Sequence, residues 1–298
     1  MKKISFLKYL IIVSLGVMFL DVVIRLTFTP VFNNLPEGSK AAETYKFMTM
    51  KDPVNIVVLG ASTANHHYVS TQIEDSLNMT CYNYGWDGRS ILYQYLSLIT
   101  AIEHGDVKIA ILDMGKSLLC NEWTEERISD LYPYYWENDT IKNMVNEING
   151  RYMSLLMCSA MLQFNSQYFN LLASINDIKG YTPLPYKGKP VIVKKTFTGK
   201  STPIQVEDVH PVALKYFGRL VDICNKNNIR LVICLSPRLI DSSDDNRYIK
   251  QLCKENGLEC WDMSELIQDP LLFSDATHLN EKGAILYTNE VIRILKDL

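Results

Sequence analysis

The stretch Asn55-Ile56-Val57-Val58-Leu59-Gly60-Ala61-Ser62 decides the fold. Its apolar residues form a short continuous run, which is typical of a strand in a parallel sheet covered on both faces. Gly60 ends the run, and a turn of small residues then presents the hydroxyl of Ser62. Ligands bind at the carboxyl ends of such strands, so this position suits a reactive side chain.

Similar segments alternate along the rest of the chain. Short apolar runs predict strands at 55–59, 80–84, 107–114, 230–235 and 258–261. Amphipathic patterns predict helices at 71–77, 90–104, 212–227, 244–256 and 282–298. Strands that alternate with helices indicate βαβ units, so we expect an α/β domain built on a parallel sheet.

A second stretch, Phe273-Ser274-Asp275-Ala276-Thr277-His278-Leu279-Asn280, lies near the carboxyl end. A histidine can take the proton of a serine when a carboxylate holds its other ring nitrogen. We therefore expect Ser62 as nucleophile, His278 as base and Asp275 as the group that orients the base. Taken singly, Ser62 could instead cap a helix, and the Asp275–His278 segment could be a surface turn.

In this order, the two stretches resemble motifs of the SGNH/GDSL hydrolase superfamily, over roughly residues 54–117 and 229–298. Gly60-Ala61-Ser62 resembles the first block of that family, whose serine is the nucleophile. Asn83-Tyr84-Gly85-Trp86-Asp87-Gly88 is similar to the second block, which implies that Gly88 lends its N–H to the oxyanion hole beside the N–H of Ser62. The last block is similar to Asp275–His278, followed by Gly283. The resemblance implies a flavodoxin-like three-layer α/β/α fold.

One block departs from the family pattern, which has Gly-x-Asn-Asp after the third strand. This chain has Asp113-Met114-Gly115-Lys116-Ser117, with no Asn at the matching place. Loss of one oxyanion donor typically costs about 2.7–4 kcal/mol of transition-state stabilisation. Ser117 is nearest to the missing Asn, and Lys116 and Asn121 are the other candidates to replace it.

Two classes of function follow from the resemblance. The first is a serine esterase or O-acyltransferase that acts on acyl groups, with acetyl expected, of an envelope glycan or related polymer. The second is a non-catalytic SGNH-like module that binds or scaffolds in an envelope assembly. The expected partners are accordingly an acylated glycan or small acyl ester, the lipid bilayer and proteins of an envelope assembly.

Three basic residues follow strand ends and are candidates for binding an anionic substrate, namely Arg89, Lys116 and Arg238. Taken singly, a solvated surface charge is the preferred interpretation of each. The adjacent His66 and His67 would face different ways on a helix, so they make a poor metal pair, and we expect them in a loop or at the rim of the site.

The amino terminus differs in kind from the rest of the chain. Lysines at positions 2, 3 and 8 precede an apolar segment that continues to about residue 28. Such a segment can cross a bilayer core of roughly 30 Å, and the lysines favour an N-inside orientation. We expect a membrane anchor at 1–28 in a bacterial inner membrane, crossing it once, with the domain facing the periplasm or exterior. Asp21 and Arg25 lie four residues apart and can pair, which keeps a buried amphipathic helix open as an alternative to an anchor or a cleaved signal peptide.

The remaining segments complete the predicted organisation. Residues 29–53 are polar and contain three prolines, which indicates a linker to an SGNH-like domain at 54–298. A long insertion at about 119–210 interrupts that domain and carries a helical pattern at 141–169. Insertions at this edge often form lids or substrate walls, although packing decoration is an equal alternative.

The composition of the chain argues against nucleic acid, metal ions and cofactors as ligands. The formal net charge is −3 and there is no block of basic residues, which argues against nucleic-acid binding. Seven cysteines occur without a CxxC pair or zinc-type spacing, so we expect no metal and no cofactor. Cys253 and Cys260 are close enough in sequence for a disulfide.

Overall fold

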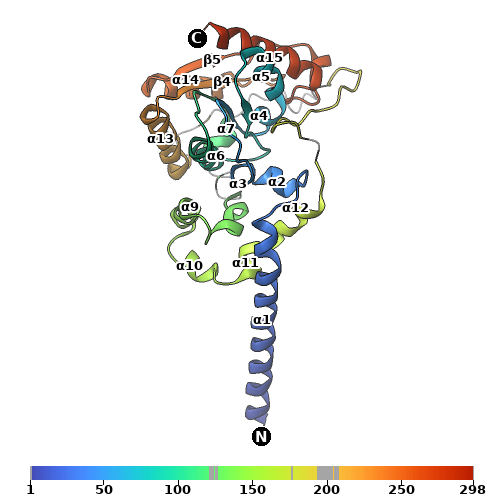
Figure 1. Ribbon diagram of the computed structural model, residues 1–298, viewed down its shortest axis with the longest axis vertical. Coiled ribbons are helices and arrows are strands. Elements are labelled where there is room, and N and C mark those ends of the chain that lie inside the picture. The colour runs from blue at the N-terminus through green and yellow to red at the C-terminus, as the bar shows by residue number, and fades with distance from the viewer. Residues whose placement is uncertain are drawn as a thin grey trace. The chain divides into compact units, whose positions relative to one another are not determined.

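The computed structural model describes residues 2–120, 124, 127–175, 177–192, 204 and 208–297. The chain divides into two compact units (Figure 1). One unit, called the anchor unit after the membrane anchor expected at 1–28, comprises Met1–Ala42 and Ile128–Ser174. The other, the sheet unit, comprises Glu43–Arg127 and Ile175–Leu298. The expected insertion at 119–210 is therefore divided between the two units.

The sheet unit is built on five parallel strands in the order β2-β1-β3-β4-β5. The strands are β1 (Ile56–Gly60), β2 (Cys81–Asn83), β3 (Ile109–Asp113), β4 (Arg230–Leu235) and β5 (Glu259–Asp262). This is the strand order of flavodoxin-like folds, in which ligands bind where the order reverses, between β1 and β3. The predicted α/β fold with a parallel sheet is confirmed.

Helices cover both faces of the sheet. The described helices of this unit are α3 (Lys46–Thr49), α4 (Ser62–His67), α5 (Ser70–Leu77), α6 (Ile91–His104), α7 (Lys116–Leu119), α13 (Pro211–Lys226), α14 (Ser243–Glu255), η5 (Pro270–Leu272) and α15 (Glu281–Lys296). On one face, α5 and α15 lie against each other and bury Ile73 and Val291 with Val58 and Val232 of the strands (Figure 1). On the other face, α6 and α13 pack together over β1 and β4. These layers bring the carboxyl ends of the strands to one open edge.

The predicted strands and helices of the sheet unit lie within one or two residues of the observed ends, which is the usual scatter of element boundaries. The range 29–53 differs from the expected linker. Within it, α2 (Lys40–Thr44) and α3 form, and Tyr45, Lys46 and Phe47 are buried. The cysteines at 253 and 260 are free thiols, so the possible disulfide between them is absent from the structure.

The anchor unit consists of one long helix and a set of short ones. Its described elements are α1 (Lys2–Phe32), η1 (Ile128–Tyr134), α9 (Asp139–Asn149), α10 (Met153–Leu156), α11 (Ala160–Phe164), η2 (Asn165–Tyr168) and α12 (Phe169–Leu172). The helical pattern at 141–169 is therefore not one helix. Gly150 and Asn165 interrupt it with φ angles of 84° and 36°, a left-handed region that a right-handed helix cannot contain.

The helix α1 is long and apolar enough to cross a membrane. An 18-residue window within Phe6–Phe32 has a mean hydropathy of 2.2, and each residue from Phe6 to Leu20 is exposed. Length and composition alone make it a candidate membrane span or signal sequence. Asp21 and Arg25 can pair by their spacing, and the hydrogen bonds described for them run to the α11 segment, as given below.

Candidate active site

The backbone around Gly60 places Ser62 at the open edge of the sheet. Gly60 has a φ of 146°, and a Cβ there would lie 2.7 Å from the Cβ of Ala64 and 2.8 Å from the carbonyl oxygen of Asp113. The buried amide of Gln94 accepts from the Gly60 N–H and donates to its carbonyl, both at 2.9 Å. Only glycine fits this junction, which turns the chain from β1 into α4 with Ser62 as the first helical residue.

Three of the predicted site residues lie in hydrogen-bond contact with one another. The Nε2 of His278 is 2.7 Å from the Oγ of Ser62, and the Nδ1 of His278 is 2.8 Å from Oδ2 of Asp275. Asp275 also accepts from the backbone N–H groups of Thr277 and His278, at 2.8 and 3.0 Å. This serine–histidine–aspartate arrangement is the one that activates a serine hydroxyl for attack on an acyl carbon.

The electrostatics of the carboxylate suit this arrangement. Partial burial would raise the pKa of Asp275, but hydrogen bonds from His278 and Thr277 and the charge of the imidazole outweigh it. The pKa therefore lies well below its usual range, and Asp275 stays ionised at neutral pH. An ionised partner holds the proton of His278 on Nδ1 and leaves Nε2 to accept from Ser62.

His67 supports the His278 turn from behind. It is fully buried, and burial lowers the pKa of its imidazole well below the usual value, so the ring is neutral. Its Nε2 accepts the backbone N–H of Leu279 at 3.0 Å. His66 and His67 end α4 and do not lie in a loop, but His66 does border the site, with its ring 5.4 Å from that of His278.

The loop 85–88 offers one of its two glycines as an oxyanion donor. The Gly85 N–H is engaged by Oδ1 of Asn83 at 2.8 Å, whereas the described hydrogen bonds include none from the N–H of Gly88. Gly88 has a φ of 66°, a turn conformation that favours glycine. The Ser62 N–H stands at a helix start, where it has no acceptor within the helix.

A buried lysine holds this loop in place. The Nζ of Lys46 donates to the carbonyl oxygens of Gly180 and Gly85 at 2.7 and 3.2 Å, and it lies 5.2 Å from the centre of the Trp86 ring. Asn65 donates to the same two carbonyls. Sequence reasoning missed Lys46 because it lies in the range expected to be a linker.

The loop is also tied to α4. Oδ1 of Asp87 lies 3.1 Å from Nε2 of His66, while Nδ1 of His66 contacts the carbonyl oxygen of Thr182 at 2.7 Å. The segment around Thr182 belongs to the expected insertion, so this part of the insertion does border the site.

The Asp113–Ser117 segment, which departs from the SGNH/GDSL pattern, lies against a basic residue that the sequence does not predict there. A Cβ at Gly115 would lie 2.6 Å from Nη2 of Arg238, so the guanidinium rests against the glycine backbone. Ser117, the expected third donor, lies in α7, and the described hydrogen bonds include none from its hydroxyl. Asn121 lies outside the described residues. Lys116 is 3.8 Å from Asp208 and half-buried.

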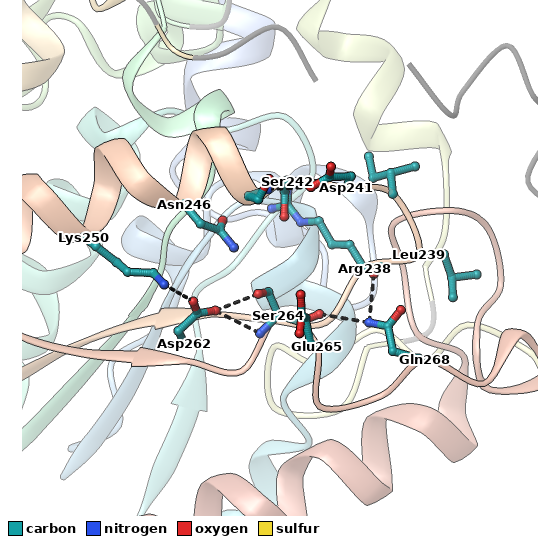
Figure 2. Close-up of a pocket in the computed structure, with 12 residues that line it drawn as sticks. Arg238, Leu239, Asp241, Ser242, Asn246, Lys250, Asp262, Ser264, Glu265 and Gln268 are labelled. Carbon is teal, nitrogen blue, oxygen red and sulfur yellow. Dashed lines mark hydrogen bonds and ion pairs between the residues drawn. The ribbon is translucent and has the colours of Figure 1, made fainter. Parts of the chain in front are cut away.

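The three predicted substrate-binding residues differ in accessibility. Arg89 is only 5% exposed, and its guanidinium stacks 4.8 Å from the ring centre of Tyr93, so its burial argues against direct substrate binding. Arg238 lines a polar cavity of about 550 Å³ at the carboxyl ends of β4 and β5 (Figure 2). Across this cavity, Lys250 of α14 pairs with Asp262 (Figure 2).

A mainly apolar cavity of about 710 Å³ is also lined by Ile240. Val191, Ile192, Ile240 and Phe273 form its apolar wall, and Asp275 is at its edge. The cavity is large enough for a small acyl or aryl group beside the His278 turn.

A buried carboxyl lies beneath the site at the end of β3. Burial raises the pKa of Asp113 to about 6, although hydroxyls of Ser236, Tyr68 and Thr63 and the charge of Arg238 act in the opposite direction. No described group forms a well-aligned hydrogen bond with either carboxyl oxygen.

Comparisons with known proteins find likeness among solved structures alone. No family model and no curated protein matches the chain. A G-D-S-L family protein from Desulfitobacterium hafniense is 10% identical over 81% of this chain and 99% of its own, with a TM-score of 0.41. A psychrotrophic esterase from a Pseudoalteromonas species is 10% identical over 82% and 97%, with a TM-score of 0.41. A GDSL-like lipase from Bacteroides thetaiotaomicron is 11% identical over 90% and 100%, with a TM-score of 0.39. The case for function therefore rests on this chain's own residues.

Proposed function

We propose that the chain is a membrane-anchored SGNH-type serine esterase or O-acyltransferase, with acyl groups of an envelope glycan or related polymer, acetyl foremost, as its substrate. The observation that carries the proposal is the pair of contacts at His278, 2.7 Å to Ser62 and 2.8 Å to Asp275. The first contact joins residues 216 positions apart, which helix capping or turn formation does not require.

The reaction proceeds in two acyl transfers. Ser62 Oγ attacks the acyl carbon as its proton passes to His278 Nε2, and His278 returns that proton to the leaving alcohol. Water, or a hydroxyl of an acceptor, then attacks the ester on Ser62 and releases the serine. The N–H groups of Ser62 and Gly88 stabilise the oxyanion, and Arg238 supplies positive charge where the family has Asn.

The test uses the full chain in detergent with p-nitrophenyl acetate and a fluorophosphonate. We expect ester hydrolysis and labelling of Ser62, both lost in Ser62→Ala and retained in Ser76→Ala, a control at an exposed serine of α5. Equal background rates in all three proteins would overturn the proposal. Products formed with added acetylated and free oligosaccharides would separate hydrolysis from transfer.

The second candidate is a non-catalytic SGNH-like module of an envelope assembly. The absence of Asn from the Gly115–Ser117 segment favours it. If this candidate is correct, the fluorophosphonate should not label Ser62, and the chain should still bind an acylated glycan.

A further inference from the structure

One surface of the anchor unit has a composition unlike the rest of the chain. Residues 152–176 contain no Asp, Glu, Lys or Arg over 25 positions. The segment nevertheless exposes large apolar side chains rather than burying them, including Leu155 at 74%, Phe169 at 59% and Leu172 at 83%. Contiguous exposed apolar patches mark protein or membrane contacts, and these side chains all come from one short stretch of the chain.

This surface is fixed to the helix α1 by two charged residues. Asp21 accepts hydrogen bonds from the Ser159 hydroxyl at 2.6 Å and from the N–H groups of Ala160 and Met161 at 3.0 Å. It thereby caps the start of α11. Arg25 donates to the carbonyl oxygen of Cys158 at 2.7 Å and to Gln163 at 3.0 Å. Figure 1 shows α11 beside the C-terminal part of α1.

The position of these contacts along α1 corresponds to a membrane boundary. At a rise of 1.5 Å per residue, Arg25 lies about 33 Å along the helix from Lys3, close to the roughly 30 Å thickness of a bilayer core. With Lys3 at the inner headgroups, Asp21 and Arg25 reach the outer boundary. Every hydrogen bond that they make to α11 replaces one that headgroups or water would otherwise supply.

Exposed apolar residues and an apolar groove lie in or beside the segment that Asp21 and Arg25 bind. Leu155, Leu156, Met161 and Leu162 flank or belong to the segment bound by Asp21 and Arg25. A groove of about 280 Å³ between α1 and α11 is lined by Ile24, Phe28, Ala160, Met161, Phe164, Asn165 and Tyr168. Its volume and lining suit part of a lipid acyl chain. The exposed Tyr152 and Trp136 are residue types enriched at membrane interfaces.

We infer that α10–α12 form a second membrane contact, an interfacial platform that lies in the outer headgroup region beside α1. The occupant of the apolar surface is the lipid bilayer, because the surface is continuous with a helix whose apolar residues also lack protein cover. This inference rests on α1 spanning the membrane, which is part of the proposed function. Amphipathic segments of this kind bury their apolar side about 5–10 Å into the headgroup and acyl boundary.

The test measures depth in the full chain, reconstituted in nanodiscs that contain doxyl-labelled lipids. Cys158 and Cys260, which are not buried, are first replaced by Ser. A bimane label is then placed at Leu155→Cys or Leu162→Cys, with Val17→Cys in α1 and Asn143→Cys on the exposed side of α9 as controls. All four positions are exposed, so the label disturbs no core packing.

We expect the lipid quencher to act several-fold more strongly at 155 and 162 than at 143, and to approach its effect at 17. Quenching at 155 and 162 equal to that at 143, with position 17 quenched, would overturn the platform and leave the anchor in place. It would then point to a protein partner on this surface. A lack of quenching at position 17 would overturn both the anchor and the platform, while esterase activity of the same samples would report separately on Ser62.

Discussion

The ammonium group of Lys46 lies 3.2 Å from the carbonyl oxygen of Gly85, in the loop that leads to Gly88. Lys46 is buried beside the carboxylates of Glu43 and Asp177, at 3.4 and 3.5 Å. Burial raises the pKa of Glu43 to about 7, against the opposing charge of Lys46. The side chain of Lys46 therefore contacts both the Glu43 and Asp177 carboxylates and the loop 85–88 that is expected to supply an oxyanion donor.

Replacement of this lysine should affect both stability and catalysis. Lys46→Met leaves buried carboxylates and backbone carbonyls without their donor, which typically costs about 3–5 kcal/mol when a buried ion pair is broken. We expect a lower Tm and a reduced kcat with p-nitrophenyl acetate. Lys108→Met removes an exposed ion pair with Asp106 and should change neither quantity appreciably. If kcat per folded molecule is unchanged in Lys46→Met, the loop does not depend on Lys46.

The orienting role of Asp275 has a separate test. Asp275→Asn keeps the size of the side chain but removes the charge that fixes the proton of His278 on Nδ1, and in serine proteases this change lowers kcat about 10⁴-fold. We expect a loss of several orders of magnitude in kcat, with little change in Tm because Asp275 is more than half exposed. Asp106→Asn, at an exposed carboxylate, is the control. Activity within a few-fold of the unmodified chain would show that Asp275 is dispensable.

Much of the sheet unit follows from local sequence patterns. Continuous apolar runs such as Ile56–Gly60 identify parallel strands because both sheet faces are covered, and each run ends where a polar or small residue follows. The Ser62 and Asp275–His278 segments could be found in the same way, since both follow from residue order and spacing.

The rest depends on contacts that no local pattern records. Lys46 looks like a solvated charge in sequence, but its acceptors are carbonyl oxygens at positions 85 and 180, far along the chain. From the sequence, Arg238 is expected to bind a substrate anion or to be a solvated surface charge, whereas its packing on Gly115 follows from the tertiary structure. The capping of α11 by Asp21 was likewise hidden, although the uncharged run at 152–176 is visible in the sequence.

The guanidinium of Arg238 should contribute to the rate. If it replaces the Asn that serves as an oxyanion donor in the SGNH/GDSL pattern, Arg238→Ala should lower kcat about 10²–10³-fold, as loss of one oxyanion donor does. KM should change less, because the interaction forms with the transition state. Arg247→Ala, at an arginine that is 80% exposed, is the control for loss of positive charge. A rise in KM with unchanged kcat would instead assign Arg238 to binding of an anionic substrate.

Asp113 should make the stability of the sheet unit fall as pH rises. Burial raises its pKa to about 6 from a usual value of 3.8, so the folded chain binds the proton more tightly than the unfolded chain. Stability therefore declines between about pH 4 and pH 6, by roughly 3 kcal/mol for a shift of about two units, and stays lower above that range. Asparagine does not ionise, so the Tm of Asp113→Asn minus that of the unmodified chain should increase from pH 4.5 to 7.5.

Asp262→Asn is the control. Its difference in Tm from the unmodified chain should be nearly constant over this range, because hydrogen bonds from Lys250 and Ser264 outweigh partial burial and lower the pKa of Asp262. Its carboxyl is thus mainly ionised in both states. Thermal unfolding of the full chain in detergent at several pH values measures both trends, and a constant difference for Asp113→Asn would show that Asp113 ionises without cost.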